Sequence, residues 1–113
     1  MVHFDYEKVK AYFDNDKIIL KGFLTLLQKE LPKSEAELEK SFADKDLEGI
    51  VEAAHKLKGT SLSAGLNQLT SMATKLNKLT VFDETLISGL INALVKEVAI
   101  ILPLVQEKRK DLA

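Results

Sequence analysis

The chain has 113 residues, which suits a single domain over 1–113. It has a formal net charge of −1, from 16 basic and 17 acidic side chains, which argues against electrostatic binding to nucleic acid or to an anionic membrane. The absence of cysteine excludes disulfides, thiolate zinc sites and thiol nucleophiles. The N-terminus has no apolar signal-peptide core, and no apolar run approaches the ~20 residues of a membrane helix, so we expect a cytoplasmic protein that does not enter the membrane.

The first half of the chain is predicted to form three helices. A short one covers about 6–13, and residues 14–16 then offer capping side chains for a second helix over about 17–31. The apolar residues at helical spacing in this second helix are Ile19, Phe23, Leu26 and Leu27. A third helix begins either at Pro32, which suits a first turn, or at Ser34, which has a glutamate three residues later and reads as a capping box.

The second half is predicted to form three more helices. Asp46 is a plausible N-cap for one that ends near Gly65, and the next covers about 66–79. Asp83 is the expected cap of the last helix, over about 84–110. The residues expected to face inward in this last helix are Leu86, Leu90, Leu94, Val98, Ile101, Leu102 and Val105.

Pro103 lies inside that last helix and removes one backbone donor, so we expect a kink or a restart there. Short connections between long amphipathic helices imply antiparallel neighbours. We therefore predict an all-α fold, an antiparallel up-down four-helix bundle with one or two short additional N-terminal helices.

One helical stretch combines residues that suit chemistry at a surface. His55 follows Ala54, a member of the apolar stripe, so we expect the imidazole at the edge of the buried face, half packed and half open. Gly59 lies one turn further on, and a mid-helix glycine costs about 1 kcal/mol relative to alanine. We interpret it as space through which another molecule reaches the ring. Lys58 flanks the ring and Lys56 adds positive potential, so both would attract a phosphoryl group.

Each of these signals also has an ordinary explanation. A lone histidine in a helix is usually a surface or boundary residue, a lone glycine is usually a packing choice, and lysines usually serve solubility. Their joint spacing favours function without identifying the reaction.

Residues 54–61 read Ala-His-Lys-Leu-Lys-Gly-Thr-Ser and are followed by Gly65. This segment resembles the histidine-containing phosphotransfer (HPt) domain of two-component phosphorelays. The family pattern is alanine-histidine-any residue-leucine-lysine-glycine and two small residues, with a further glycine about ten residues after the histidine. The resemblance extends over a core of about 16–105, although Ser63 and Ala64 replace the commoner asparagine-leucine before the second glycine.

The resemblance implies roles in holding the phosphoryl group. His55 corresponds to the phosphorylated histidine, with Nε2 as the expected acceptor because it projects furthest from the helix. Lys58 corresponds to the lysine that neutralises the phosphoryl charge, and Lys56 is a further candidate for that task. Asn77 lies where some members carry a glutamine beside the histidine, so it is the last candidate of this group.

The resemblance also implies a docking surface. Gly59 corresponds to the glycine that clears the approach, and we expect Ser61 and Leu62 to keep the same surface low and open. The first helix after Asp14 and the helix bearing Leu62 and Leu66 are candidates to contact a partner.

The reaction implied is reversible phosphoryl exchange between His55 and an aspartate of a response-regulator receiver domain or a hybrid histidine kinase. The sequence has no glycine-rich phosphate loop, no ATP-binding motif and no acidic metal triad. We therefore expect a monomeric phosphocarrier rather than an enzyme, with no metal or cofactor of its own and with Mg²⁺ held by the partner receiver domain.

Other interpretations stay open. A helical interaction scaffold would use His55 only as a boundary residue, and an HPt module excised from a hybrid sensor kinase would carry the same motif. The phosphoacceptor helix pair of a sensor kinase places an acidic residue directly after its histidine, where this chain has Lys56. A metal site is disfavoured because His3 and His55 are the only histidines.

Overall fold

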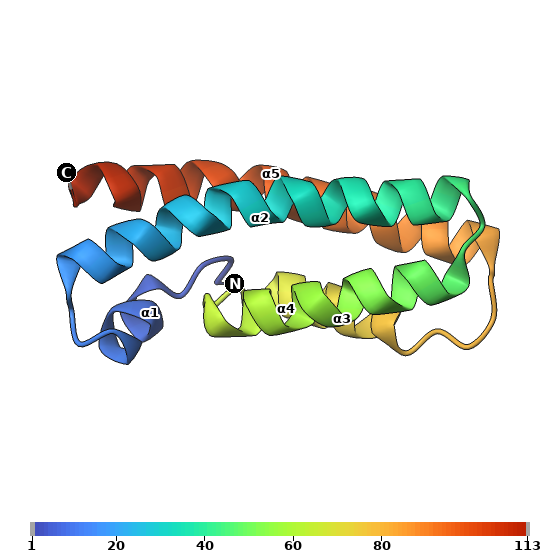
Figure 1. Ribbon diagram of the computed structural model, residues 1–113, viewed down its shortest axis with the longest axis horizontal. Helices are drawn as coiled ribbons and strands as arrows, with labels where there is room; N and C mark the ends of the chain where they lie inside the picture. The colour runs from blue at the N-terminus through green and yellow to red at the C-terminus, as the bar shows by residue number, and fades with distance from the viewer. Residues whose placement is uncertain (1, 113) are drawn as a thin grey trace.

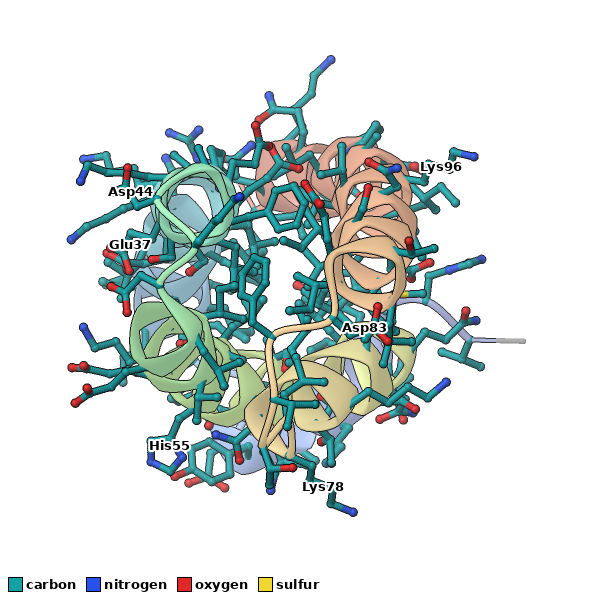
Figure 2. The ribbon with its side chains drawn as sticks, turned by 90° about the vertical axis from the view of Figure 1, so that its right-hand side faces the viewer. Glu37, Asp44, His55, Lys78, Asp83 and Lys96 are labelled. Atoms are coloured by element: carbon teal, nitrogen blue, oxygen red, sulfur yellow. The ribbon has the colours of Figure 1, made fainter. Side chains whose placement is uncertain are left out.

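The computed structural model describes residues 2–112, and four long helices make up most of it. The helices are α1 (Tyr6–Tyr12), α2 (Lys17–Ala43), α3 (Leu47–Ser63), α4 (Asn67–Asn77) and α5 (Glu84–Asp111). Figure 1 shows α2 and α5 side by side, with α3 and α4 alongside them and successive helices running in opposite directions. Viewed from the end, the four helices surround a common core (Figure 2). The fold is the predicted antiparallel four-helix bundle, with one short helix added at the N-terminus.

Aspartate side chains cap the N-termini of α1, α2, α3 and α5. Asp16 accepts hydrogen bonds from two backbone N–H groups of α2, at 3.0 and 3.1 Å. Asp46 and Asp83 each accept one from the third residue that follows, at 2.9 and 3.1 Å. These contacts satisfy donors that the helix itself leaves free. The caps predicted at residues 14–16, at Asp46 and at Asp83 are confirmed.

The core is a continuous aliphatic layer, to which every long helix contributes one face. The fully buried large side chains are Leu20, Leu24, Leu27, Leu31, Leu38, Ile50, Leu57, Leu66, Leu69, Leu76, Ile87 and Leu94. Each such residue stabilises the fold by about 1.5–3 kcal/mol through its removal from water. The rotation of each helix about its axis is therefore set by which of its residues enter this layer.

Helix α2 runs without a break through Pro32, so the helix boundary predicted at Pro32 or Ser34 is wrong. Pro32 is exposed, and the backbone hydrogen bond it cannot make lies on the water side. Leu31 and Leu38 are both fully buried, which holds the two halves of α2 in one register against the core. Burial of these leucines outweighs the cost of an interior proline, about 3 kcal/mol.

Helix α5 is also continuous through Pro103, so the predicted restart is absent. Its last turns stay helical beside α2, where Arg109 Nη1 donates to Gln28 Oε1 at 2.9 Å. The predicted inward face is wrong in the first half of α5. Ile87 and Ile91 are buried there, whereas Leu86 is 49% exposed.

The segment before α2 packs against the bundle. The backbone N–H of Asp5 donates to the carbonyl of Gly65 at 2.8 Å, and His3 Nδ1 lies 2.7 Å from Glu97 Oε2 of α5. Gly65 has a φ of +67°, and a Cβ there would lie 2.7 Å from the Asp5 carbonyl oxygen. The turn between α3 and α4 therefore requires glycine, both for its backbone conformation and for this close approach.

Replacing Pro32 with alanine should stabilise the protein. The exchange restores a helical hydrogen bond and removes a steric clash worth about 3 kcal/mol, and it returns about 1 kcal/mol of chain entropy to the unfolded state. We expect the free energy of unfolding in urea to rise by about 1–2 kcal/mol. A free energy of unfolding below that of the wild type would mean that a break at Pro32 is part of the native helix.

Candidate functional site

His55 lies on the outer face of α3. The residues of α3 that are buried are Ile50, Ala53, Ala54, Leu57 and Ser61. At 100° per residue, His55 lies about 145° from the centre of that stripe, further out than the edge position expected from the sequence. Its side chain is exposed and points away from the bundle (Figure 2). Among residues 2–112, no hydrogen bond or ion pair engages the imidazole, so both ring nitrogens are open to a partner.

The surface beside His55 is open on the side of Gly59, where no side chain projects. A Cβ added at Gly59 would meet nothing within 4 Å, so this glycine leaves open space one turn from the ring. Leu62, a further turn along, is more than half exposed. An approaching molecule therefore finds an apolar surface in line with the imidazole and no side chain at Gly59 to obstruct it.

A groove of about 370 Å³ runs between α2 and α3 along this open surface. Its lining residues are Phe23, Leu26, Leu27, Glu30, Gly59, Thr60 and Ser63. Leu26 is more than half exposed although its helix already buries a full leucine face. The apolar spacing noted in the sequence of α2 thus belongs largely to this groove, and a second face of α2 fills the core.

Helix α1 extends the same surface, which the sequence did not indicate. A second hollow, of about 520 Å³, lies between α1 and the end of α3 and includes Tyr12 and Leu62. The Phe13 ring packs edge-on against Tyr12 and at a tilt against Phe23, with centroids 4.9 and 5.1 Å apart. The aromatic residues thus join α1 to the groove. The one sequence signal for this contact is the pair of adjacent aromatic residues that ends the first helix.

The two lysines lie on different sides of the histidine. Lys58 is partly exposed and follows His55 by three residues, so it lies one turn along the same face. Lys56 instead lines a polar hollow between α2 and α3, together with Glu37 and Glu52. Neither lysine has an ion pair within residues 2–112, but these carboxylates lower the positive potential around Lys56. The geometry favours Lys58 of the two for contact with an anion beside the ring.

Asn77 ties α4 to the part of α3 that carries His55. Its Nδ2 donates to the carbonyl oxygen of Val51 at 3.1 Å. In the helix this carbonyl also accepts the backbone N–H of His55, which follows Val51 by four residues. The described contact of Asn77 is therefore with the backbone beneath the histidine, and contact with a phosphoryl group stays a prediction.

One residue expected at the docking surface, Ser61, lies in the interior instead. Ser61 is fully buried, accepts a hydrogen bond from the Thr70 hydroxyl at 2.9 Å and donates to the Lys58 carbonyl at 3.1 Å. Leu66 is also fully buried. Ser61 lies about 120° around the helix from His55, so its small side chain serves packing between α3 and α4 rather than access.

Residues 2–112 contain no group of three or more histidine, aspartate or glutamate side chains that could hold a metal ion. His3 is paired with Glu97 on α5, whereas His55 stands alone on α3. The two histidines therefore do not form a common site.

An exposed histidine on a four-helix bundle, flanked by a lysine and an open glycine, defines a carrier-type surface rather than an enclosed catalytic pocket. The family model described as Hpt domain matches residues 22–100. The chain therefore belongs to the Hpt domain family, whose members transfer phosphoryl groups through histidine in phosphorelay signalling. No curated protein sequence and no solved structure matches the chain. Hpt domains are phosphocarriers that generally lack an ATP site of their own and interact with receiver domains.

The open space at Gly59 predicts that Gly59→Ala stabilises the protein. Alanine is favoured over glycine within a helix by about 1 kcal/mol, and its methyl group meets no neighbour within 4 Å. We expect urea unfolding to show a gain of about 0.5–1 kcal/mol. A loss of stability would show that the glycine is required for packing rather than for access.

Proposed function

We propose that this protein is a phosphocarrier whose His55 accepts a phosphoryl group from an aspartate of one receiver domain and passes it to another. The observation that carries the proposal is the exposed imidazole beside the open surface of Gly59. The location expected from the sequence, the cytoplasm, is part of the same proposal.

The transfer is an in-line displacement. The unprotonated Nε2 attacks phosphorus, the bond from phosphorus to the aspartyl oxygen breaks, and the aspartate leaves as a carboxylate while the phosphoryl group remains on Nε2. The reverse reaction returns the group to an aspartate. Lys58 lies one turn away and neutralises charge on the phosphoryl oxygens. Mg²⁺, bound by the receiver domain, supplies further charge neutralisation from the partner's side.

The receiver domain docks on the surface formed by the groove and by α1. Phe23 and Leu26 from α2, Tyr12 from α1 and Leu62 from α3 are the apolar residues on which it packs. These side chains border His55 on one side of the molecule, so a partner that covers them brings its aspartate to the ring and excludes water from the reaction.

Phosphate uptake from a phosphorylated receiver domain tests the carrier proposal. We expect acid-labile phosphate on the wild type and none on His55→Gln. His3→Gln is the matched control, because it removes the other histidine of the chain and should leave uptake unchanged. Label that persists on His55→Gln, or that is lost on His3→Gln alone, would contradict the assignment.

Lys58→Ala should slow transfer without affecting the fold. Loss of one charge-assisted contact of about 1.4 kcal/mol corresponds to a roughly tenfold slower rate. Lys58→Arg keeps the charge and should recover most of the rate, and Lys56→Ala should have a smaller effect. Rapid-quench measurement of the transfer rate distinguishes these variants, and an unchanged rate for Lys58→Ala excludes its role.

A further inference from the structure

Helix α5 is more apolar than its place in the bundle requires. Its most apolar 18-residue window has a mean hydropathy of 1.8, so by length and composition α5 could cross a membrane, yet only 33% of that window is buried. Between Thr85 and Gln106 the one exposed charge is Lys96. The bundle core therefore leaves a large part of this helix without a partner.

The unpartnered residues form one stripe along α5. Its members, the outer stripe, are Leu86, Gly89, Ala93, Ile100 and Leu104, all of them exposed. At 100° per residue they fall within about 60° of one another. Leu86 and Ile100 are 49% and 45% exposed. Glu97, at the edge of the stripe, is buried against His3 and does not interrupt it.

The outer stripe lies on the opposite side of the bundle from His55. In the end view, His55 on α3 and Lys96 on α5 project from opposite corners of the four-helix arrangement (Figure 2). A molecule bound along α5 would therefore leave the histidine and its groove uncovered. The surface used for transfer does not explain the apolar character of α5.

We propose that the outer stripe binds the outer stripe of a second copy of this chain, with the two α5 helices antiparallel. Charge supports this occupant, because α5 begins with Asp83 and Glu84 and carries three basic residues, 108–110, in its last turn. An antiparallel pair places the acidic end of each helix beside the basic end of the other and also opposes the helix dipoles. Parallel pairing would bring like charges together.

A single two-fold axis between Lys96 and Glu97 satisfies shape and charge together. About this point, Ala93 faces Ile100 of the second copy, and Gly89 faces Leu104 of the second copy. Ile100 and Leu104 thus each meet a small residue, which lets the helices approach closely in the middle of the stripe. Leu86 lies level with Glu107 of the second copy. The same axis sets the acidic first turn of each helix level with the basic last turn of the other. Self-complementary contacts of this kind are what an isologous dimer requires.

The dimer is expected to be weak. From Leu86 to Leu104 the stripe is about 28 Å long, and one helix pair of that length falls below the ~800 Å² per partner of a standard interface. Lys96 lies next to its symmetry mate and opposes association. A dissociation constant on the order of 10–100 μM fits these opposing effects.

Sedimentation equilibrium from about 5 to 500 μM tests the dimer. The wild type should approach twice its chain mass of 12.6 kDa at high concentration. Ile100→Glu should weaken association more than tenfold and leave phosphoryl transfer intact, whereas Lys96→Ala should strengthen it several-fold. Leu26→Glu is the matched control, an equally exposed apolar residue on the transfer face, and it should impair transfer without affecting association.

Cysteine cross-linking tests the orientation, because the chain has no cysteine of its own. Mixed Ala93→Cys and Ile100→Cys proteins should form a disulfide-linked heterodimer faster than either protein links to itself. A monomer at 500 μM, a dimer unaffected by Ile100→Glu, or faster linking of identical variants would overturn the proposal. So would binding of the monomer to phosphatidylcholine vesicles through the same stripe, since the occupant would then be lipid.

Discussion

The rotation of α3 about its own axis is the constraint on which the site depends. Leu57 and Ile50 must enter the core, and at 3.6 residues per turn this fixes where every other side chain of α3 points. His55 is then directed outward, and its ring makes no hydrogen bond or ion pair with any other residue that the structure describes. The Asn77 amide adds a tie to the backbone beneath it. The position of the proposed acceptor is thus set by aliphatic packing on the opposite face of the same helix.

The sequence predicts much of this arrangement because α3 is clearly amphipathic. Only one rotation of the helix about its axis places its aliphatic residues in the core, and the Asp46 cap fixes where the helix begins. The fold class follows from these signals, and so does the placement of His55 outside the core, although the imidazole lies further out than the predicted edge position. Ser61 was misplaced because a serine in a helix reads as polar, whereas here Thr70 and a backbone carbonyl satisfy its hydroxyl inside the bundle.

The long helices were harder to predict, for two physical reasons. A proline signals a break in any local view of the chain, yet the core contacts on both sides of Pro32 and of Pro103 keep α2 and α5 continuous. In α5 the difficulty is to predict which side of the helix faces the core. Apolar residues surround much of the helix, so the pattern permits either Leu86 or Ile87 to face inward, and only packing selects Ile87. The same surplus of apolar residues produces the outer stripe.

The open setting of His55 has a consequence for how such a carrier discriminates between partners. An imidazole without a pocket around it holds a phosphoryl group in contact with water, where any molecule that reaches the ring can compete for it. In the proposed carrier, selectivity then comes from the surrounding surface, chiefly the groove beside Leu26 and the aromatic residues that join it to α1. The reactive nitrogen is the same in any exposed histidine, so recognition of the partner would depend on residues that do not contact the phosphoryl group.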